Sequence, residues 1–186
     1  MKWNWQEFER ERLMKDSYAK NVASRVATGE LQIITEFKGE FSWLSNFYWH
    51  YSMPYTVEHK FQAGKACDDP NMFRVIIDAS SPGKAKKLGR QAKLPTGWST
   101  RRHIVMRNAL LEKFSDPPMR DWLLATMPIP LVEGNHWHDN YWGDCLCEKC
   151  SDIPGNNKLG LELMYVRAIL AGDQPSYDKL AEEFAG

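Results

Sequence analysis

Three polar side chains with complementary chemistry lie close together in the sequence: Glu58, Gln62 and Lys65. A helix turns by about 100° per residue, so these positions would lie within about 60° of one another on one helix face. A carboxyl group transfers protons and a neutral amine attacks carbon, so the pattern predicts acid–base and nucleophilic chemistry on one bound group. An ordinary solvent-exposed face of glutamate and lysine has the same spacing and is the alternative.

A second candidate is the aromatic segment HWHDNYWGD at residues 136–144. Asp139 stands three residues before Trp142, so a carboxylate lies near a ring that can stack on a planar base. Carboxylates bind ribose hydroxyls or transfer protons, and aromatic faces bind bases and sugars. The alternative is a turn aspartate beside buried aromatic residues.

The segment from residue 79 to residue 111 holds eight lysines and arginines and no acidic residue. The whole chain has 24 basic and 24 acidic residues, so its net charge of zero is a balance between +8 in this segment and −8 elsewhere. A helix predicted to begin at Ser81 and Pro82 offers backbone N–H groups to an anion. The segment therefore predicts a phosphate-bearing ligand, with weak attraction to long duplex DNA; a solvated basic face is the alternative.

Three cysteines are clustered within six residues, at Cys145, Cys147 and Cys150, after His136 and His138. Three thiolates and one imidazole make a ligand set for tetrahedral zinc. We take His136 as the fourth ligand and expect the zinc to be structural, with no cofactor needed for catalysis. Free thiols are the alternative, and cysteines this close together do not form an extracellular disulfide framework.

Proline, glycine and capping residues divide the chain into a mostly helical pattern. Thr56 is the predicted N-cap of the helix that carries Glu58 and Lys65. We predict helices over residues 3–28, 57–68, 70–79, 82–92, 100–114, 119–127 and 157–172, with a last short helix over 176–186. We predict strands over 31–39 and 129–133, a loop with short strand pieces over 41–55, and a long loop over 133–156. A chain of 186 residues suffices for a single compact core.

The longest stretch without charged or strongly polar residues covers residues 122–132 and contains two prolines. It is much shorter than the roughly 20 residues that span a bilayer. The N-terminal segment also lacks the apolar core of a secretory signal. We expect a cytoplasmic protein that has no membrane partner.

Six motifs resemble those of the NADAR (YbiA-like) family and follow one another in the family's order. They are LSNFY at 44–48, TVEHKFQAGKA at 56–66, SPGKAKKLGR at 81–90, R-x3-M-x3-L-x2-KF at 102–114, DNYWGD at 139–144 and GNNKLGLELMYVR at 155–167. The resemblance implies a compact, mostly helical α+β domain with a small sheet over residues 31–172. Residues 1–30 are then an N-terminal helical extension and residues 173–186 a C-terminal helical tail.

The resemblance also implies an N-glycosidase that cleaves a ribose C1–nitrogen bond. Two substrate classes accompany the family: ADP-ribose attached to guanine in DNA, and phosphorylated ribosylamino-pyrimidine intermediates of riboflavin synthesis. We expect the first, with an ADP-ribosylated DNA or nucleotide as substrate, and keep the second as the alternative. A non-catalytic module that binds ADP-ribose or an NAD derivative is a third reading. No obligate protein partner is inferred.

Carried over by motif, Lys65 is expected to attack C1 and form a Schiff base, Glu58 to shuttle protons, and Asp139 to orient the ribose. The other motif positions are expected to bind substrate: Ser45, Asn46, Phe47, Tyr48, Gln62, Arg90, Arg102, Trp142, Gly143 and Asn157. The chain departs from the family at Phe61, where tyrosine is usual, and in the cysteine cluster that follows the WGD motif.

Overall fold

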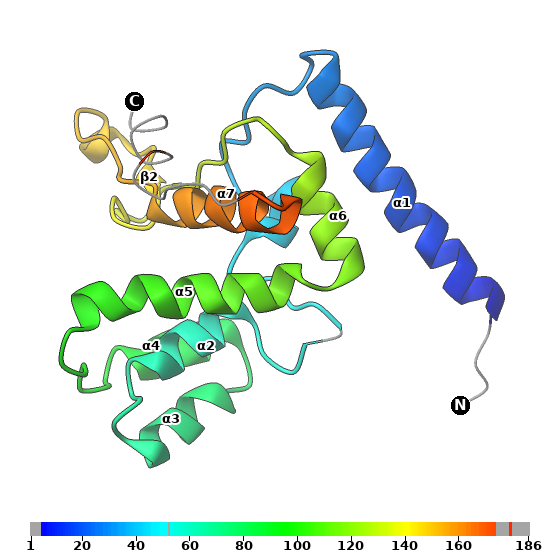
Figure 1. The fold of residues 1–186 in the computed structure, drawn as a ribbon. Coiled ribbons are helices and arrows are strands. Elements are labelled where there is room, and N and C mark those ends of the chain that lie inside the picture. Colours follow the sequence, from blue (N-terminus) through cyan, green and yellow to red (C-terminus); the bar gives the residue numbers. More distant parts are fainter. Residues whose placement is uncertain (1–4, 52, 174–178, 180–186) are drawn as a thin grey trace. The chain divides into compact units, whose positions relative to one another are not determined.

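The computed structural model describes residues 5–51, 53–173 and 179. Helices dominate this part of the chain, and the two strands are short (Figure 1). In chain order the elements are α1 (Trp5–Ala27), the 3₁₀ helix η1 (Gly39–Leu44), α2 (Val57–Gly64), α3 (Pro70–Ile77), α4 (Pro82–Gly89), α5 (Trp98–Phe114), α6 (Pro117–Ala125), β1 (Gly134–Asn135), β2 (Asp144–Cys145), the 3₁₀ helix η2 (Glu148–Cys150) and α7 (Lys158–Ala171).

Local capping chemistry sets the starts of three helices, as predicted. The side chain of Thr56 accepts a hydrogen bond from the backbone of His59 at the start of α2. Asp69 and Ser81 cap α3 and α4 in the same way, each followed by a proline in the first turn. The long helix α5 begins at Trp98, slightly earlier than predicted. The predicted helix over 176–186 lies outside the described residues, apart from residue 179.

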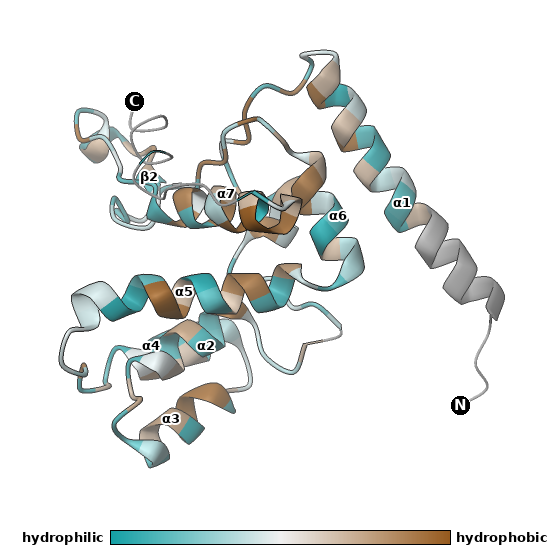
Figure 2. Ribbon diagram, in the orientation of Figure 1, coloured by the Kyte–Doolittle hydropathy of each residue, from teal (hydrophilic) through white to brown (hydrophobic). Residues whose placement is uncertain are grey.

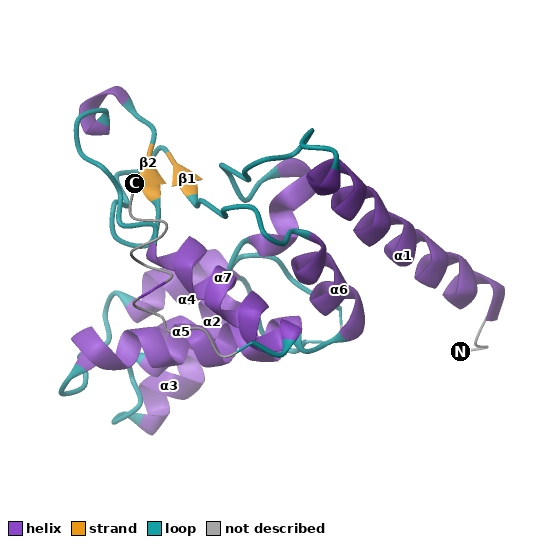
Figure 3. Ribbon diagram, turned by 45° about the horizontal axis from the view of Figure 1, so that its top comes forward, coloured by secondary structure: helices purple, strands orange, loops and turns teal. Residues whose placement is uncertain are grey.

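The predicted strands over 31–39 and 129–133 are wrong in extent. They meet in one isolated parallel bridge between Ile34 and Leu131. Pro128 and Pro130 lack backbone N–H donors, so a longer ladder cannot form beside this bridge. The small sheet instead pairs β1 with β2 in parallel (Figure 3), with Asn135 opposite Cys145. The predicted strand pieces over 41–55 are replaced by η1 and turns.

The chain divides into two compact units, one of which is Phe37–Lys113. In this unit α2, α3 and α4 pack against one another, and α5 runs beside α2 (Figure 1). Small side chains let the three short helices approach closely. Their buried cluster contains Ala63, Ala66, Ile76, Ile77, Ala79 and Ala85.

The other unit combines Met1–Glu36 with Phe114–Gly186. Here α1 packs on α6, where Trp122 donates its ring N–H to the carbonyl of Lys15 at 3.1 Å. Tyr18 adds an edge-to-face contact with the same tryptophan, at 4.9 Å between ring centroids. Within the described residues, the predicted N-terminal extension is therefore a helix packed on its own unit.

A buried arginine joins the end of α6 to α7. Helix α7 is rich in apolar residues (Figure 2) and most of it is buried. The guanidinium of Arg167 donates to the backbone oxygens of Thr126 and Ile129, both at 2.9 Å, and to the Thr126 hydroxyl. Burial lowers the pKa of Arg167 to about 10, so the side chain remains charged at neutral pH.

Within the described segments, no helix combines the length and apolar character needed to cross a membrane. The elements of the described residues confirm the predicted fold class, a mostly helical α+β chain with one small sheet.

Candidate active site

Glu58 and Gln62 form a buried hydrogen-bonded pair on α2. The Gln62 amide donates to the Glu58 carboxylate at 2.7 Å, and the two residues are only 3% and 5% exposed, respectively. The backbone N–H of Glu58 also donates to the carbonyl of Asn46 at 3.0 Å. The carboxyl group is therefore fixed in place rather than solvated, which excludes the reading of a solvent-exposed polar face.

Lys65 follows α2 directly and is partly buried. Burial lowers the pKa of its amine, the nearby charge of Glu58 raises it, and Lys86 and Arg90 lower it further, so that the net shift is downward. The amine lies 5.5 Å from the ring centroid of Phe61. A lysine in these surroundings spends more time as the neutral, nucleophilic amine than an exposed lysine does.

His59, between Glu58 and Lys65 in the chain, has both ring nitrogens in hydrogen bonds that stabilise the fold. Its Nε2 lies 2.9 Å from the carbonyl oxygen of Ala79, and its Nδ1 lies 2.8 Å from the Thr56 hydroxyl. A carbonyl only accepts hydrogen bonds, so Nε2 is assigned as the donor to Ala79. The histidine of the VEH motif thus ties α2 to the segment that follows α3.

A buried lysine secures the LSNFY segment. The ammonium of Lys113 donates to the carbonyl of Ser45 at 2.8 Å and lies 5.6 Å from the ring centroid of Tyr48. The Asn46 amide donates to the sulfur of Met106 at 3.5 Å. Lysine side chains are almost never fully buried without a partner. Lys113 had no predicted role, yet it is 1% exposed and anchors this segment to α5.

Two side-chain amide oxygens are buried without a hydrogen-bond partner in the described part of the chain: Oδ1 of Asn46 and Oε1 of Gln62. Such atoms are costly unless a ligand or water satisfies them. Both residues are predicted to bind substrate. Phe47, which follows Asn46 in the chain, is 41% exposed, and the amine of Lys86 lies 5.5 Å from its ring centroid. Ligand hydroxyl groups are suitable donors for these oxygens.

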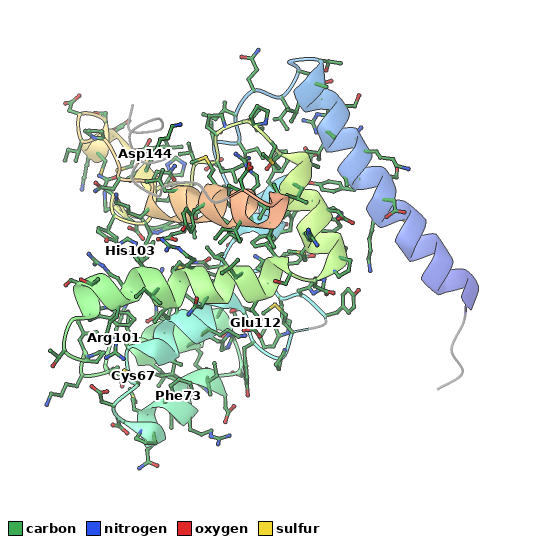
Figure 4. All side chains as sticks on the ribbon, viewed as in Figure 1. Cys67, Phe73, Arg101, His103, Glu112 and Asp144 are labelled. Carbon is green, nitrogen blue, oxygen red and sulfur yellow. The ribbon has the colours of Figure 1, made fainter. Side chains whose placement is uncertain are left out.

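The predicted phosphate-binding arginines lie on α4 and α5. Arg90 is the exposed C-cap of α4, and Arg102 donates its side-chain Nε–H to the carbonyl of Ser99 at 3.1 Å. Helices α2 and α5 are also joined by the ion pair of Lys60 with Glu112, a residue of α5 that is labelled in Figure 4. Substrate contact by either arginine stays a prediction.

Gly89 on α4 faces Gln62 so closely that no side chain fits. A methyl group at this position would approach the Cβ of Gln62 to 2.8 Å. We expect Gly89→Ala to lower the free energy of unfolding by about 1–3 kcal/mol through overpacking. The matched control is Gly83→Ala on the same helix, where nothing lies within 4 Å. Urea unfolding of both variants measures the difference, and equal stabilities would contradict the contact.

The segment around Asp139 belongs to the other unit, where it forms a tight turn. One carboxylate oxygen of Asp139 accepts from the backbone of Tyr141 at 3.1 Å and of Trp142 at 2.9 Å. The buried side chain of Asn135 bonds the Asp139 backbone, donating to its carbonyl at 2.8 Å. Asp139 therefore shapes the turn, and its catalytic role stays a prediction.

Gly143 and Asn157 hold the same loop together. A side chain on Gly143 would overlap the carbonyl of Glu133 and approach the amide of Asn135 to 2.7 Å. Asn157, with φ 44°, accepts from the backbone of Glu133 at 3.0 Å and donates to the carbonyl of Leu131 at 2.8 Å. Both residues thus have scaffolding roles, and their substrate contacts stay predictions.

The cysteine cluster gathers one histidine, but not the predicted one. Ligand atoms of His138, Cys145, Cys147 and Cys150 all lie within 4.8 Å of one another, so this group can hold a metal ion. The choice of His136 is wrong for this group, because its imidazole instead lies 3.7 Å from the carboxylate of Glu36. Burial and the neighbouring cysteine thiols raise the pKa of Cys150 to about 11.

The predicted residues thus fall into two sets. Glu58, Gln62 and Lys65, with the LSNFY segment and the two arginines, lie in Phe37–Lys113. Asp139, Trp142, Gly143 and Asn157 lie in the other unit, together with the cysteine cluster near the labelled Asp144 (Figure 4).

Comparison with known proteins agrees with this fold and motif order. A family model described as NADAR domain matches residues 32–171, so the chain belongs to the NADAR family. The NMR structure of the E. coli protein YbiA is similar, with a TM-score of 0.64 and 35% identity over 76% of this chain and 86% of that one.

Two curated relatives carry functional names. A Nostoc punctiforme protein named as an N-glycosidase is 38% identical over 117 residues, covering 60% of this chain and 71% of the relative. The maize chloroplastic riboflavin biosynthesis protein PYRR is 33% identical over 139 residues, covering 68% of this chain. The chain spans only 21% of the maize protein's length.

Proposed function

We propose that the protein is an N-glycosidase that hydrolyses a ribose C1–nitrogen bond, with ADP-ribose attached to guanine in DNA as its substrate. The observation that carries the proposal is the buried Glu58, held by Gln62, on the same helix as a lysine whose pKa is lowered. The relative named as an N-glycosidase supports the reaction class.

The reaction proceeds by exchange of one C1–nitrogen bond for another. A proton from the Glu58 carboxyl group opens the sugar ring at its oxygen, which leaves C1 doubly bonded to the base nitrogen. The neutral amine of Lys65 then adds to C1. The Glu58 carboxylate takes a proton from the added lysine nitrogen and passes it to the base nitrogen, which departs as the C1–nitrogen bond breaks. Water adds to the resulting lysine Schiff base, which releases the sugar aldehyde and restores the amine.

The unpaired oxygens of Asn46 and Gln62 suit the hydroxyl groups of a ribose, since each can accept a hydrogen bond. The exposed ring of Phe47, with Lys86 5.5 Å from its centroid, offers a flat apolar surface next to a positive charge. Lys86, Arg90 and the other basic residues of α4 and α5 suit a diphosphate. A nucleoside diphosphate sugar combines these three features.

A phosphorylated ribosylamino-pyrimidine is the second candidate substrate. The maize relative is named for riboflavin biosynthesis, and such an intermediate contains the same ribose C1–nitrogen bond and a phosphate. A module that only binds ADP-ribose is a third possibility, and it needs no nucleophile.

The two substrates are best offered side by side to the purified protein. We expect release of ADP-ribose from guanine-modified oligonucleotides, detected by chromatography, to be much faster than cleavage of the ribosylamino-pyrimidine phosphate. The reverse order would assign the riboflavin-type substrate. Tight binding of ADP-ribose with neither substrate cleaved would contradict an enzyme.

The pH dependence of kcat/KM reports the state of Lys65. Activity rises with pH as the ammonium loses its proton, and the charge of Lys86 lowers the pKa of Lys65. Removing that charge in Lys86→Met raises the pKa of Lys65, so we expect the ascending limb to move to higher pH. Lys84→Met, which removes an exposed charge from the same helix, is the control. An unmoved limb in Lys86→Met would show that another group titrates.

A further inference from the structure

Three thiols and one imidazole converge in the loop between β1 and α7. Nδ1 of His138 lies 3.3 Å from the sulfur of Cys150 and 3.4 Å from the sulfur of Cys147, and Cys145 completes the group. Around a tetrahedral zinc with Zn–S bonds of about 2.3 Å, donor atoms stand about 3.8 Å apart. The observed separations, none above 4.8 Å, let one ion contact all four atoms.

The strand register and side-chain hydrogen bonds to the backbone place these side chains. The strand register puts Cys145 opposite Asn135, three residues before His138. The side-chain oxygen of Asn135 accepts from the backbone N–H of Trp137 and of Asp139, both at 3.2 Å, so both neighbours of His138 are held. His138 itself has φ 65°, a left-handed conformation that is uncommon outside glycine.

The remaining two ligands are brought together by the short helix η2. The backbone N–H of Cys150 donates to the carbonyl of Cys147 at 2.9 Å, which turns both side chains back toward β2. Cys145 and Cys150 are buried, Cys147 is partly buried and His138 is exposed, so the cluster extends from the interior of the loop to its surface. Three sulfurs crowded together in this way gain most from a cation that their thiolates can share.

We infer that His138, through Nδ1, together with Cys145, Cys147 and Cys150, binds one structural zinc ion. Three thiolates and one imidazole are a closed ligand set that leaves no position for substrate. The ion fixes the loop that includes the Asp139 turn, because the ligand His138 directly precedes it. The inference does not rest on the proposed function, since metal content is measured directly.

The test begins with the full chain purified under reducing conditions. We expect close to one zinc per chain by elemental mass spectrometry. After removal of zinc by a chelator, titration with Co²⁺ should give the intense ligand-field and thiolate charge-transfer bands of tetrahedral cobalt, saturating at one ion per chain. Substoichiometric zinc together with the absence of these bands would overturn the inference. A disulfide between two cysteines of the cluster in the purified protein would overturn it as well.

Matched variants identify the ligands. We expect His138→Ala to lose the ion or to change the cobalt spectrum, whereas His136→Ala and Cys67→Ser retain one ion per chain. In the metal-bound wild type a thiol reagent should modify Cys67 alone, and all four free cysteines after chelation. Loss of the ion in His136→Ala but not in His138→Ala would contradict the ligand assignment. Because the thiol count is measured on the wild type, it tests the inference even where a variant fails to fold.

Discussion

Replacing Lys65 by methionine is expected to lower kcat/KM by about 10⁴-fold or more, because the covalent route through the lysine amine is removed. Methionine keeps much of the side-chain volume, and Lys65 is already partly buried against Phe61, so the fold should persist. Turnover of ADP-ribosylated guanine DNA measures the loss, and circular dichroism checks the fold. Binding of ADP-ribose should weaken far less than turnover.

The matched control is Lys60→Met, a lysine on the same helix that pairs with Glu112. It should retain activity. Borohydride added during turnover should trap a sugar adduct on wild type and on Lys60→Met, and none on Lys65→Met. A wild type that turns over without any trapped adduct would contradict the Schiff base and leave Glu58 as the sole catalytic group.

Glu58→Gln is expected to lower kcat/KM by about 10²–10⁴-fold, the usual contribution of a positioned acid–base group. The substitution preserves shape, and the new amide oxygen can still accept the hydrogen bond from Gln62. We therefore expect little change in thermal stability beside a large loss of turnover. Steady-state kinetics with thermal unfolding of the same samples separates the two effects.

The control for this change is Glu112→Gln, which removes an exposed carboxylate from α5. It should leave kcat within a few-fold of wild type. If Glu58→Gln retains full activity, the proton must move through another group, and the buried carboxyl is then structural. If it loses both folding and turnover, the more conservative Glu58→Asp decides between the two roles.

The helical part of the fold was predictable because its signals are local. Thr56, Asp69 and Ser81 cap three helices through bonds that span only a few residues. The strands were not predictable in the same way, since Gly134–Asn135 and Asp144–Cys145 pair through tertiary contacts. One such contact is the side chain of Asn157, which bonds the backbone of Glu133 from the start of α7.

The candidate site was predictable where helix periodicity governs it, as for Glu58 and Gln62. The metal-binding histidine was not, because His136 and His138 are only two residues apart and both precede the cysteines. Their difference comes from the left-handed backbone at His138 and the bonds from Asn135 on either side of it. Nothing in the residue types encodes that conformation.

For Lys113, helix periodicity predicts burial, but the general preference of lysine for the surface predicts exposure. It stands three residues after Leu110 on α5, on the apolar face that also includes Met106. Periodicity therefore places it inside, whereas the general preference of lysine places it outside. The carbonyl of Ser45, which resolves the conflict, lies far away in sequence.

The hydrogen bonds of Arg167 connect the end of α6 to α7 through groups that do not change protonation in acid. Its bonds run to the oxygens of Thr126 and Ile129, none of which takes up a proton in acid. The pKa of Arg167, about 10, leaves the guanidinium charged throughout the acidic range. Acidification thus leaves the hydrogen bonds between Arg167 and these oxygens unchanged.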